Sequence, residues 1–151
     1  RNLAINRELW LWPAWWKLWD TNEAISARLG QAGACEAVVD ALRAHAGHMH
    51  VAEATCAAVC NLAVSSDANR ARLAEAGACE AVVEALRAHG GRGTEGFDRG
   101  ACVAIKYLAI NHPANVRRLV SAAGSTAALL QDVERCSVPD AWRRDVARAL
   151  A

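Results

Sequence analysis

The sequence predicts an all-α protein made of stacked helical repeats, and two observations support this fold class. Segments 27–45 and 71–89 are copies of one another that differ at three positions only, with Leu29 returning as Leu73 after 44 residues. A fixed period of a few tens of residues is typical of arrays whose units stack in a line. Inside the copies the apolar residues recur at helical spacing, as at Val82, Val83 and Leu86.

The second copy shows the plan of one unit, with three helices expected over 68–76, 79–89 and 96–110. Residues 65–67 (Ser-Ser-Asp) offer an N-cap for the first helix, and Gly77 is suited to end it. The third helix has an apolar stripe with spacings of four, three, one and three residues, which fits a helix face. That stripe consists of Phe97, Ala101, Ala104, Ile105 and Leu108.

The flanking segments repeat this plan less completely. Residues 1–6 (RNLAIN) match the ends of the third helices near 61–64 and 107–111, so they predict the end of a preceding repeat. The third unit begins at Pro113, a residue favoured at the first helical position, and 139–151 predicts its last helix. We therefore expect a segment of a longer array, divided into 1–6, an insert at 7–21, repeats at 22–66 and 67–112, and a degenerate repeat at 113–151.

The motifs of these units resemble the armadillo repeat over about residues 22–135. The pattern is Leu-x3-Gly-Ala, followed later by a third helix that ends with Asn-Leu-Ala or Tyr-Leu-Ala. Its first occurrence is Leu29, Gly33 and Ala34 with Asn61–Ala63. Its second occurrence is Leu73, Gly77 and Ala78 with Tyr107–Ala109. The resemblance implies a right-handed α-solenoid whose third helices line a concave groove for a protein partner. We therefore expect a non-enzymatic interaction or scaffold module, with no catalytic residue and no cofactor, that also contacts adjacent repeats of the same protein.

The resemblance also indicates which residues would meet a partner in that groove. Helical phase places six residues there: Glu53, Ala57, Asn61, Arg99, Val103 and Tyr107. In the nuclear-import members of the family, a Trp stands four residues before an Asn that grips the peptide backbone. Here the corresponding pairs are Ala57 with Asn61 and Val103 with Tyr107, which argues against recognition of basic import signals. The alternative is that this face is simply solvated.

Residues 7–21 interrupt the repeat pattern. Leu3 and Leu29 are 26 residues apart, whereas the corresponding interval in later units, such as Leu62 to Leu73, is 11. Five exposed Trp rings would exceed the largest apolar patch of an ordinary soluble monomer, about 300–600 Å². The insert is therefore expected to pack on the first repeat, to bind a protein partner, or to contact a membrane surface through residues 10–19. Its aromatic residues are Trp10, Trp12, Trp15, Trp16 and Trp19. The alternative function is a structural subunit of a larger, membrane-associated assembly anchored by this insert.

The charge balance and the cysteines exclude several other classes. With 17 basic and 16 acidic residues, the net charge of +1 gives no support for nucleic-acid binding. Two of the cysteine pairs, Cys35 with Cys79 and Cys56 with Cys102, recur with the repeat, which predicts small buried side chains in a reducing compartment. We therefore expect an intracellular, cytoplasmic protein.

Two local patterns could suggest a ligand site, and each has a simpler explanation. Cys56 and Cys60 lie one helical turn apart, with His48 and His50 just before them, so a zinc site can be drawn. The repeat of Cys56 at Cys102 lacks a second ligand, so packing is favoured and no metal is expected. The glycine-rich segment 90–96 lacks the Lys-Ser/Thr of a phosphate loop, which favours a long connection between helices.

Overall fold

The computed structural model describes residues 23–151, and its helices fall into three consecutive units of three. Unit one contains α1 (Glu23–Gln31), α2 (Ala34–Ala44) and α3 (Met49–Ala63). Unit two contains α4 (Asp67–Ala76), α5 (Ala78–His89) and α6 (Glu95–Ala109). Unit three contains α7 (Pro113–Ala123), α8 (Thr126–Glu134) and α9 (Asp140–Leu150). Residues 23–151 include no strand, which confirms the all-α prediction. The predicted repeat end at 1–6 and the insert at 7–21 lie outside the described residues.

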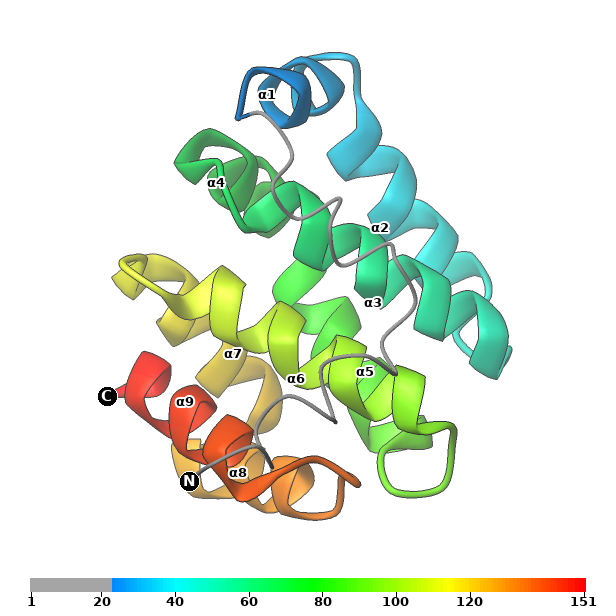
Figure 1. Ribbon diagram of the computed structural model, residues 1–151, viewed down its shortest axis with the longest axis vertical. Helices are drawn as coiled ribbons and strands as arrows, with labels where there is room; N and C mark the ends of the chain where they lie inside the picture. Colours follow the sequence, from blue (N-terminus) through cyan, green and yellow to red (C-terminus); the bar gives the residue numbers. More distant parts are fainter. Residues whose placement is uncertain (1–22) are drawn as a thin grey trace, which may run out of the picture.

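The units stack in chain order along the long axis of the molecule (Figure 1). Helices that hold the same place in consecutive units pack side by side: α1 with α4 and α4 with α7, α2 with α5 and α5 with α8, and α3 with α6 and α6 with α9. Among residues 23–151, the substantial helix packing joins helices of one unit or of neighbouring units. The result is a repeat-like helical fold in which each unit buries its apolar faces against its neighbours.

The helix ends follow the residues that the sequence marks as breaks. The Ser66 hydroxyl accepts a hydrogen bond from the backbone N–H of Asn69 at 3.2 Å and so caps α4. Gly77 ends α4 with a φ of 92°, in the left-handed region where a side chain is strained. Pro113 is the first residue of α7. These features confirm the predicted cap, break and helix start.

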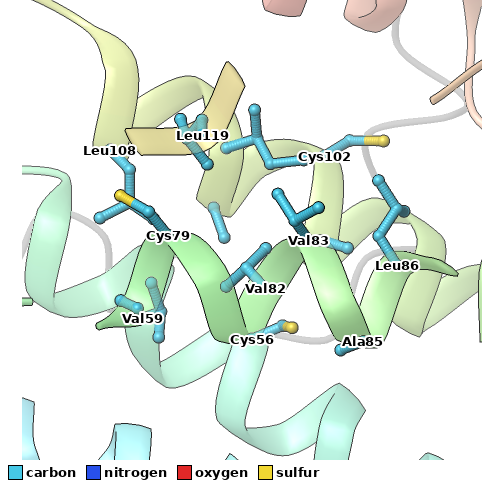
Figure 2. Close-up of a cluster of buried hydrophobic side chains, with 14 of the residues drawn as sticks. Cys56, Val59, Cys79, Val82, Val83, Ala85, Leu86, Cys102, Leu108 and Leu119 are labelled. Atoms are coloured by element: carbon cyan, nitrogen blue, oxygen red, sulfur yellow. The ribbon is translucent and has the colours of Figure 1, made fainter. Parts of the chain in front are cut away.

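The core is centred on α5, which has a unit on either side (Figure 2). Its inward side chains Cys79, Val82, Val83 and Leu86 are all between 0 and 1% exposed. They meet apolar side chains of all three units, drawn in Figure 2 as Cys56, Val59, Cys102, Leu108 and Leu119. The predicted stripe of α6 is buried as well, so the helical spacing of apolar residues identified the core correctly.

A buried asparagine ties each unit to the one before it. Asn69 on α4 is 1% exposed, and its amide nitrogen donates to the backbone oxygens of Ser26 at 2.8 Å and Leu62 at 3.1 Å. Asn115, the same position one unit later, donates to the backbone oxygen of Leu108 at 2.9 Å. Because these carbonyls lie near helix ends or face another unit, the two side chains satisfy acceptors at the unit interfaces.

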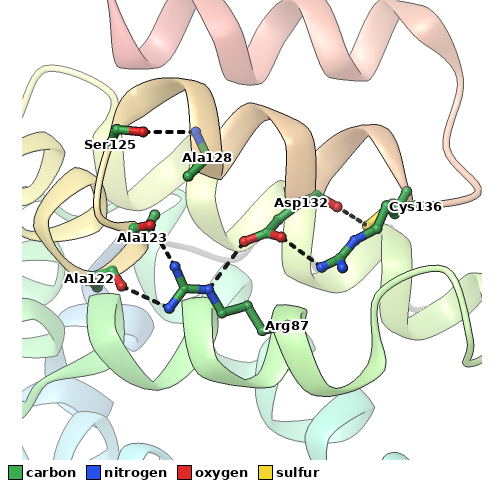
Figure 3. A network of polar contacts seen from close by, with 8 residues as sticks. Arg87, Ala122, Ala123, Ser125, Ala128, Asp132 and Cys136 are labelled. Carbon is green, nitrogen blue, oxygen red and sulfur yellow. Dashed lines mark hydrogen bonds and ion pairs between the residues drawn. The ribbon is translucent and has the colours of Figure 1, made fainter.

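Arginines also cross the interfaces between units. Arg118 donates to the backbone oxygen of Ala74 at 2.8 Å, near the C-terminus of α4, and its repeat equivalent Arg72 lies 3.5 Å from the backbone oxygen of Gly30 on α1. Arg87 on α5 donates to the backbone oxygens of Ala122 and Ala123 at the end of α7, and its Nε lies 3.4 Å from Asp132 (Figure 3). A guanidinium placed at a helix C-terminus is favoured by the helix dipole and supplies donors for the last carbonyls. Polar contacts therefore fix the register in which the apolar faces stack.

Candidate functional site

The third helices of the three units form one continuous layer, because α6 lies between α3 and α9 (Figure 1). Helices α3 and α6 pack closely at Gly100, where an added Cβ would lie 3.4 Å from the Cβ of Cys56, an ordinary van der Waals contact. The Cys60 thiol donates to the backbone oxygen of Gly100 at 3.2 Å across the same contact. This layer carries the six residues that the sequence assigned to a partner-binding face.

At the N-terminal end of the layer, the side chain of Glu53 is held by a hydrogen bond within the chain. Its carboxylate accepts a hydrogen bond from the Thr94 hydroxyl at 2.7 Å. Thr94 also caps α6 by accepting from the backbone N–H of Phe97 at 3.1 Å, so Glu53 lies at the positive end of the α6 dipole. Arg99 lies one turn into α6, with its guanidinium 3.8 Å from Glu95. This end of the layer presents charges of both signs.

The middle of the layer is apolar. Ala57 is half-buried and lies against Gly100, whose added Cβ would be 3.7 Å from the Ala57 backbone nitrogen. Val103 is buried, with 8% of its surface exposed, so its side chain serves packing between the helices. A partner that crosses this stretch would meet an apolar surface made of small side chains. Val103 would contribute little contact area to it.

At the C-terminal end of the layer, the side-chain oxygen of Asn61 accepts no hydrogen bond from the described residues. Its side-chain oxygen is buried and has no hydrogen-bond partner among the described residues, and the same holds for the Ser65 hydroxyl one turn later. An unsatisfied buried polar atom costs about 1–3 kcal/mol. Tyr107, the repeat equivalent of Asn61, is half-buried, and the Lys106 ammonium lies 5.7 Å from its ring centroid. This end therefore combines a hydrogen-bond acceptor with an aromatic ring.

Sequence reasoning assigned no residue of α9 to the layer, although α9 adds an ion pair to it. Lys106 on α6 and Asp145 on α9 are 2.8 Å apart, across the boundary of units two and three. The hydrogen bond and the positive charge of Lys106 lower the pKa of the Asp145 carboxyl. The two residues are 39 positions apart in the sequence, and their pairing depends on how α6 and α9 pack together. It could therefore not be predicted from the sequence.

This ion pair predicts a small, pH-dependent contribution to stability. We expect Lys106→Gln to lower the free energy of unfolding by under about 1 kcal/mol at pH 7, since both side chains are about a third exposed. Because the folded-state pKa of Asp145 is depressed, the contribution is present above the unfolded pKa of about 3.9 and is lost as the pH falls through the folded-state pKa. The free energies of unfolding of the two proteins, measured with urea, should therefore differ at pH 7 and converge as the pH falls below the folded-state pKa of Asp145. A difference that persists in acid would contradict this assignment.

The cysteines and histidines that could suggest a zinc site in the sequence do not form such a site in the structure. Cys56 and Cys60 are buried, at 0 and 2% exposure, whereas His48 and His50 are exposed. Burial raises the pKa of Cys56 to about 12, so this thiol is protonated at neutral pH and is a poor ligand or nucleophile. Within residues 23–151, no group of three or more His, Cys, Asp or Glu side chains is arranged to hold a metal ion. All six cysteines are free and buried, which confirms the prediction of small core side chains.

One buried acid was missed by the sequence reasoning. Asp98 is 1% exposed, and its carboxylate accepts from the backbone N–H of Gly91 at 3.1 Å and from that of Ser137 at 2.7 Å. It therefore anchors the glycine-rich connection between α5 and α6, which the sequence predicted to be a long loop, to the linker before α9. This role is structural, because the carboxylate is enclosed by its own backbone partners.

No helix in the described part of the chain has both the length and the apolar character needed to cross a bilayer. The Trp-rich insert, with Trp10, Trp12, Trp15, Trp16 and Trp19, lies outside the described residues, so its predicted contacts stay predictions. Comparison with family models, curated proteins and solved structures finds no match to the chain.

Proposed function

We propose that the chain is a non-enzymatic protein-interaction module, a right-handed α-solenoid of armadillo type that binds an extended protein segment on its third-helix layer. The proposal is supported by the internal repeat, by the stacking of equivalent helices in chain order, and by the armadillo-like motifs of the two central units. In such a stack the third helices present one surface that runs across all units, which suits an elongated ligand.

The observation that carries the proposal is the buried, unpaired side-chain oxygen of Asn61. Asn61 as a residue is partly exposed, so a rotation of its side chain would bring this oxygen to the surface, where a backbone N–H of an extended peptide can donate to it. Tyr107 lies at the same position one unit along and supplies an aromatic surface for a side chain of the partner. Glu53 and Arg99 carry opposite charges, so recognition rests on backbone and apolar contacts more than on net charge.

The test uses the purified chain and an array of immobilised peptides of about twelve residues, a length that spans the layer when extended. For peptides that the wild-type chain selects, we expect Asn61→Leu to weaken binding about tenfold, because the acceptor is lost. Asn61→Asp keeps an acceptor oxygen and should retain most of the affinity. Tyr107→Ala should weaken the same peptides.

The matched control is Glu84→Ala, at an exposed position on α5 away from the layer. It should leave peptide binding unchanged. Selection of the same peptides with equal affinity by wild type, Asn61→Leu and Tyr107→Ala would contradict the proposed site. Deletion of residues 7–21 in the same assay separates the layer from the Trp-rich insert, since only binding through the insert would be lost.

A further inference from the structure

Asp98, Cys102 and Cys136 form a buried cluster at the boundary of units two and three. Asp98 and Cys102 lie one turn apart on α6, and Cys136 lies in the linker between α8 and α9. Each of the three is 1% exposed. The Cys136 thiol is hydrogen-bonded with the Cys102 thiol and with the Asp98 carboxyl group, which also accepts from the backbone N–H of Ser137 at 2.7 Å. Two thiols from different units are therefore in direct contact.

Two members of this cluster depart from the repeat. Asp98 stands where unit one has the buried Ala52, and no cysteine follows the second helix of units one and two as Cys136 follows α8. Cys102, by contrast, recurs from Cys56. The stacking of units explains a small thiol that recurs with the period. It does not explain why an acid and a second thiol that are both outside the repeat pattern meet at that position.

Cys136 is the one cysteine of the described residues that lies outside a helix. Its sulfur is 3.7 Å from the backbone oxygen of Asp132 on α8 (Figure 3), and the next residue, Ser137, is held by Asp98. A linker between helices opens locally at a lower cost than a helix does. Its movement can therefore bring the Cys136 sulfur to solvent, and then to the distance of about 2 Å from Cys102 that a sulfur–sulfur bond requires.

We propose that Cys102 and Cys136 are a redox pair whose disulfide locks unit three onto unit two. The oxidant is a low-molecular-weight disulfide such as glutathione disulfide. The Cys136 thiolate attacks one sulfur of the oxidant and releases one thiol, which leaves a mixed disulfide; the Cys102 thiolate then attacks the Cys136 sulfur and releases the second thiol. Two protein thiols are oxidised to one disulfide, the oxidant is reduced to two thiols, and the two protons pass to the departing sulfurs.

Asp98 is the positioning residue of this pair. The hydrogen bond with Cys102, burial and the negative charge of Asp98 raise the pKa of the Cys136 thiol, so the thiol is protonated and unreactive while the linker is closed. Opening of the linker breaks the hydrogen bond between Asp98 and Ser137 and moves Cys136 away from the carboxylate. The pair is therefore protected from casual oxidation, and the rate of exchange depends on how firmly Asp98 holds the linker.

The test incubates the purified, reduced chain with glutathione disulfide, blocks the remaining thiols with N-ethylmaleimide and digests the protein without reduction. Trypsin yields the peptides 100–106 and 136–143, each with one cysteine, and mass spectrometry identifies the two when they are joined. We expect the joined peptides from the wild type, with two equivalents of reduced glutathione released per disulfide. Cys136→Ala should abolish them. Cys60→Ala, which removes a thiol that is almost as buried, is the matched control and should not.

The role of Asp98 is tested by the rate of the same reaction. Asp98→Asn removes the charge and one acceptor oxygen, so the linker should open more often and the disulfide should form about tenfold faster. Glu95→Gln, at an exposed acid on the same helix, is the control and should leave the rate unchanged. Circular dichroism checks that the variants keep their helix content, and an equal rate in Asp98→Asn and the wild type would overturn this role.

Cys56 and Cys60 report whether the reaction needs global unfolding, because both are buried in α3 and lie together on the tryptic peptide 44–70. They should stay reduced while the disulfide forms, and the oxidised chain should melt roughly 5–10 °C above the reduced one. Loss of all six thiols at one rate, separate mixed disulfides at positions 102 and 136, or equal melting of the two forms would each overturn the proposal. None of these results bears on peptide binding at Asn61.

Discussion

Replacing Asn69 with alanine should lower the free energy of unfolding by about 2–4 kcal/mol, among the largest effects of any polar substitution in the chain. The side chain is 1% exposed and donates to backbone oxygens on α1 and α3 at 2.8 and 3.1 Å. Alanine would leave both buried acceptors without a partner and would open a cavity between two units. Gly30 contributes to this contact, because a methyl group at that position would overlap the Asn69 amide.

Urea unfolding followed by circular dichroism measures this effect, and Glu75→Ala, an exposed change on the same helix, is the control with almost no expected cost. Because stability in a stack depends on contacts between neighbours, amide exchange should rise most in unit one, which has a described neighbour on one side only. Asn115→Ala should act at the next interface and raise exchange most in unit three. An equal rise over all three units for both variants would show that the stack unfolds as one block.

The repeat made much of the fold predictable from the sequence. Two copies at a constant offset place equivalent residues in equivalent surroundings, so the glycine end at Gly77 and the core positions of α5 could be predicted from their spacing alone. Asn69 and Asn115 also recur with the period, and a polar residue repeated at a helix start was a usable signal for an interface contact. That signal was missed because polar residues near helix ends are normally solvated.

The binding surface was less predictable, because its chemistry depends on how helices from different units dock. The sequence could place Asn61 and Tyr107 on one helix face, but the unpaired oxygen of Asn61 and the pairing of Lys106 with Asp145 follow from interhelical distances. The exposed apolar side chains of α1 could not be predicted for the same reason. Ile25 looks ordinary in the sequence, and its exposure has meaning only beside the buried residues of later units.

Asp98 is the strongest case of a residue that the repeat could not predict, and Asp98→Ala should lower the free energy of unfolding by about 2–4 kcal/mol. Its equivalent in unit one is Ala52, which is 0% exposed, so this position belongs to the core. The carboxylate is tolerated there because the backbone N–H groups of Gly91 and Ser137 donate to its two oxygens at 3.1 and 2.7 Å. Alanine would remove the acceptor of both N–H groups, and the loop at Gly91 and the linker at Ser137 would lose their shared anchor.

Two further variants distinguish this linking role from a simple packing defect. Asp98→Asn keeps one acceptor oxygen but turns an amide group toward the second N–H, so its cost should lie between those of wild type and Asp98→Ala. Glu95→Ala removes an exposed acid one turn away and should cost little. In amide exchange, Asp98→Ala should expose the backbone N–H groups of Gly91 and Ser137 before those of α1, because the carboxylate joins units two and three and does not touch unit one. If Asp98→Ala is no more destabilising than Glu95→Ala, the carboxylate does not hold these two connections together.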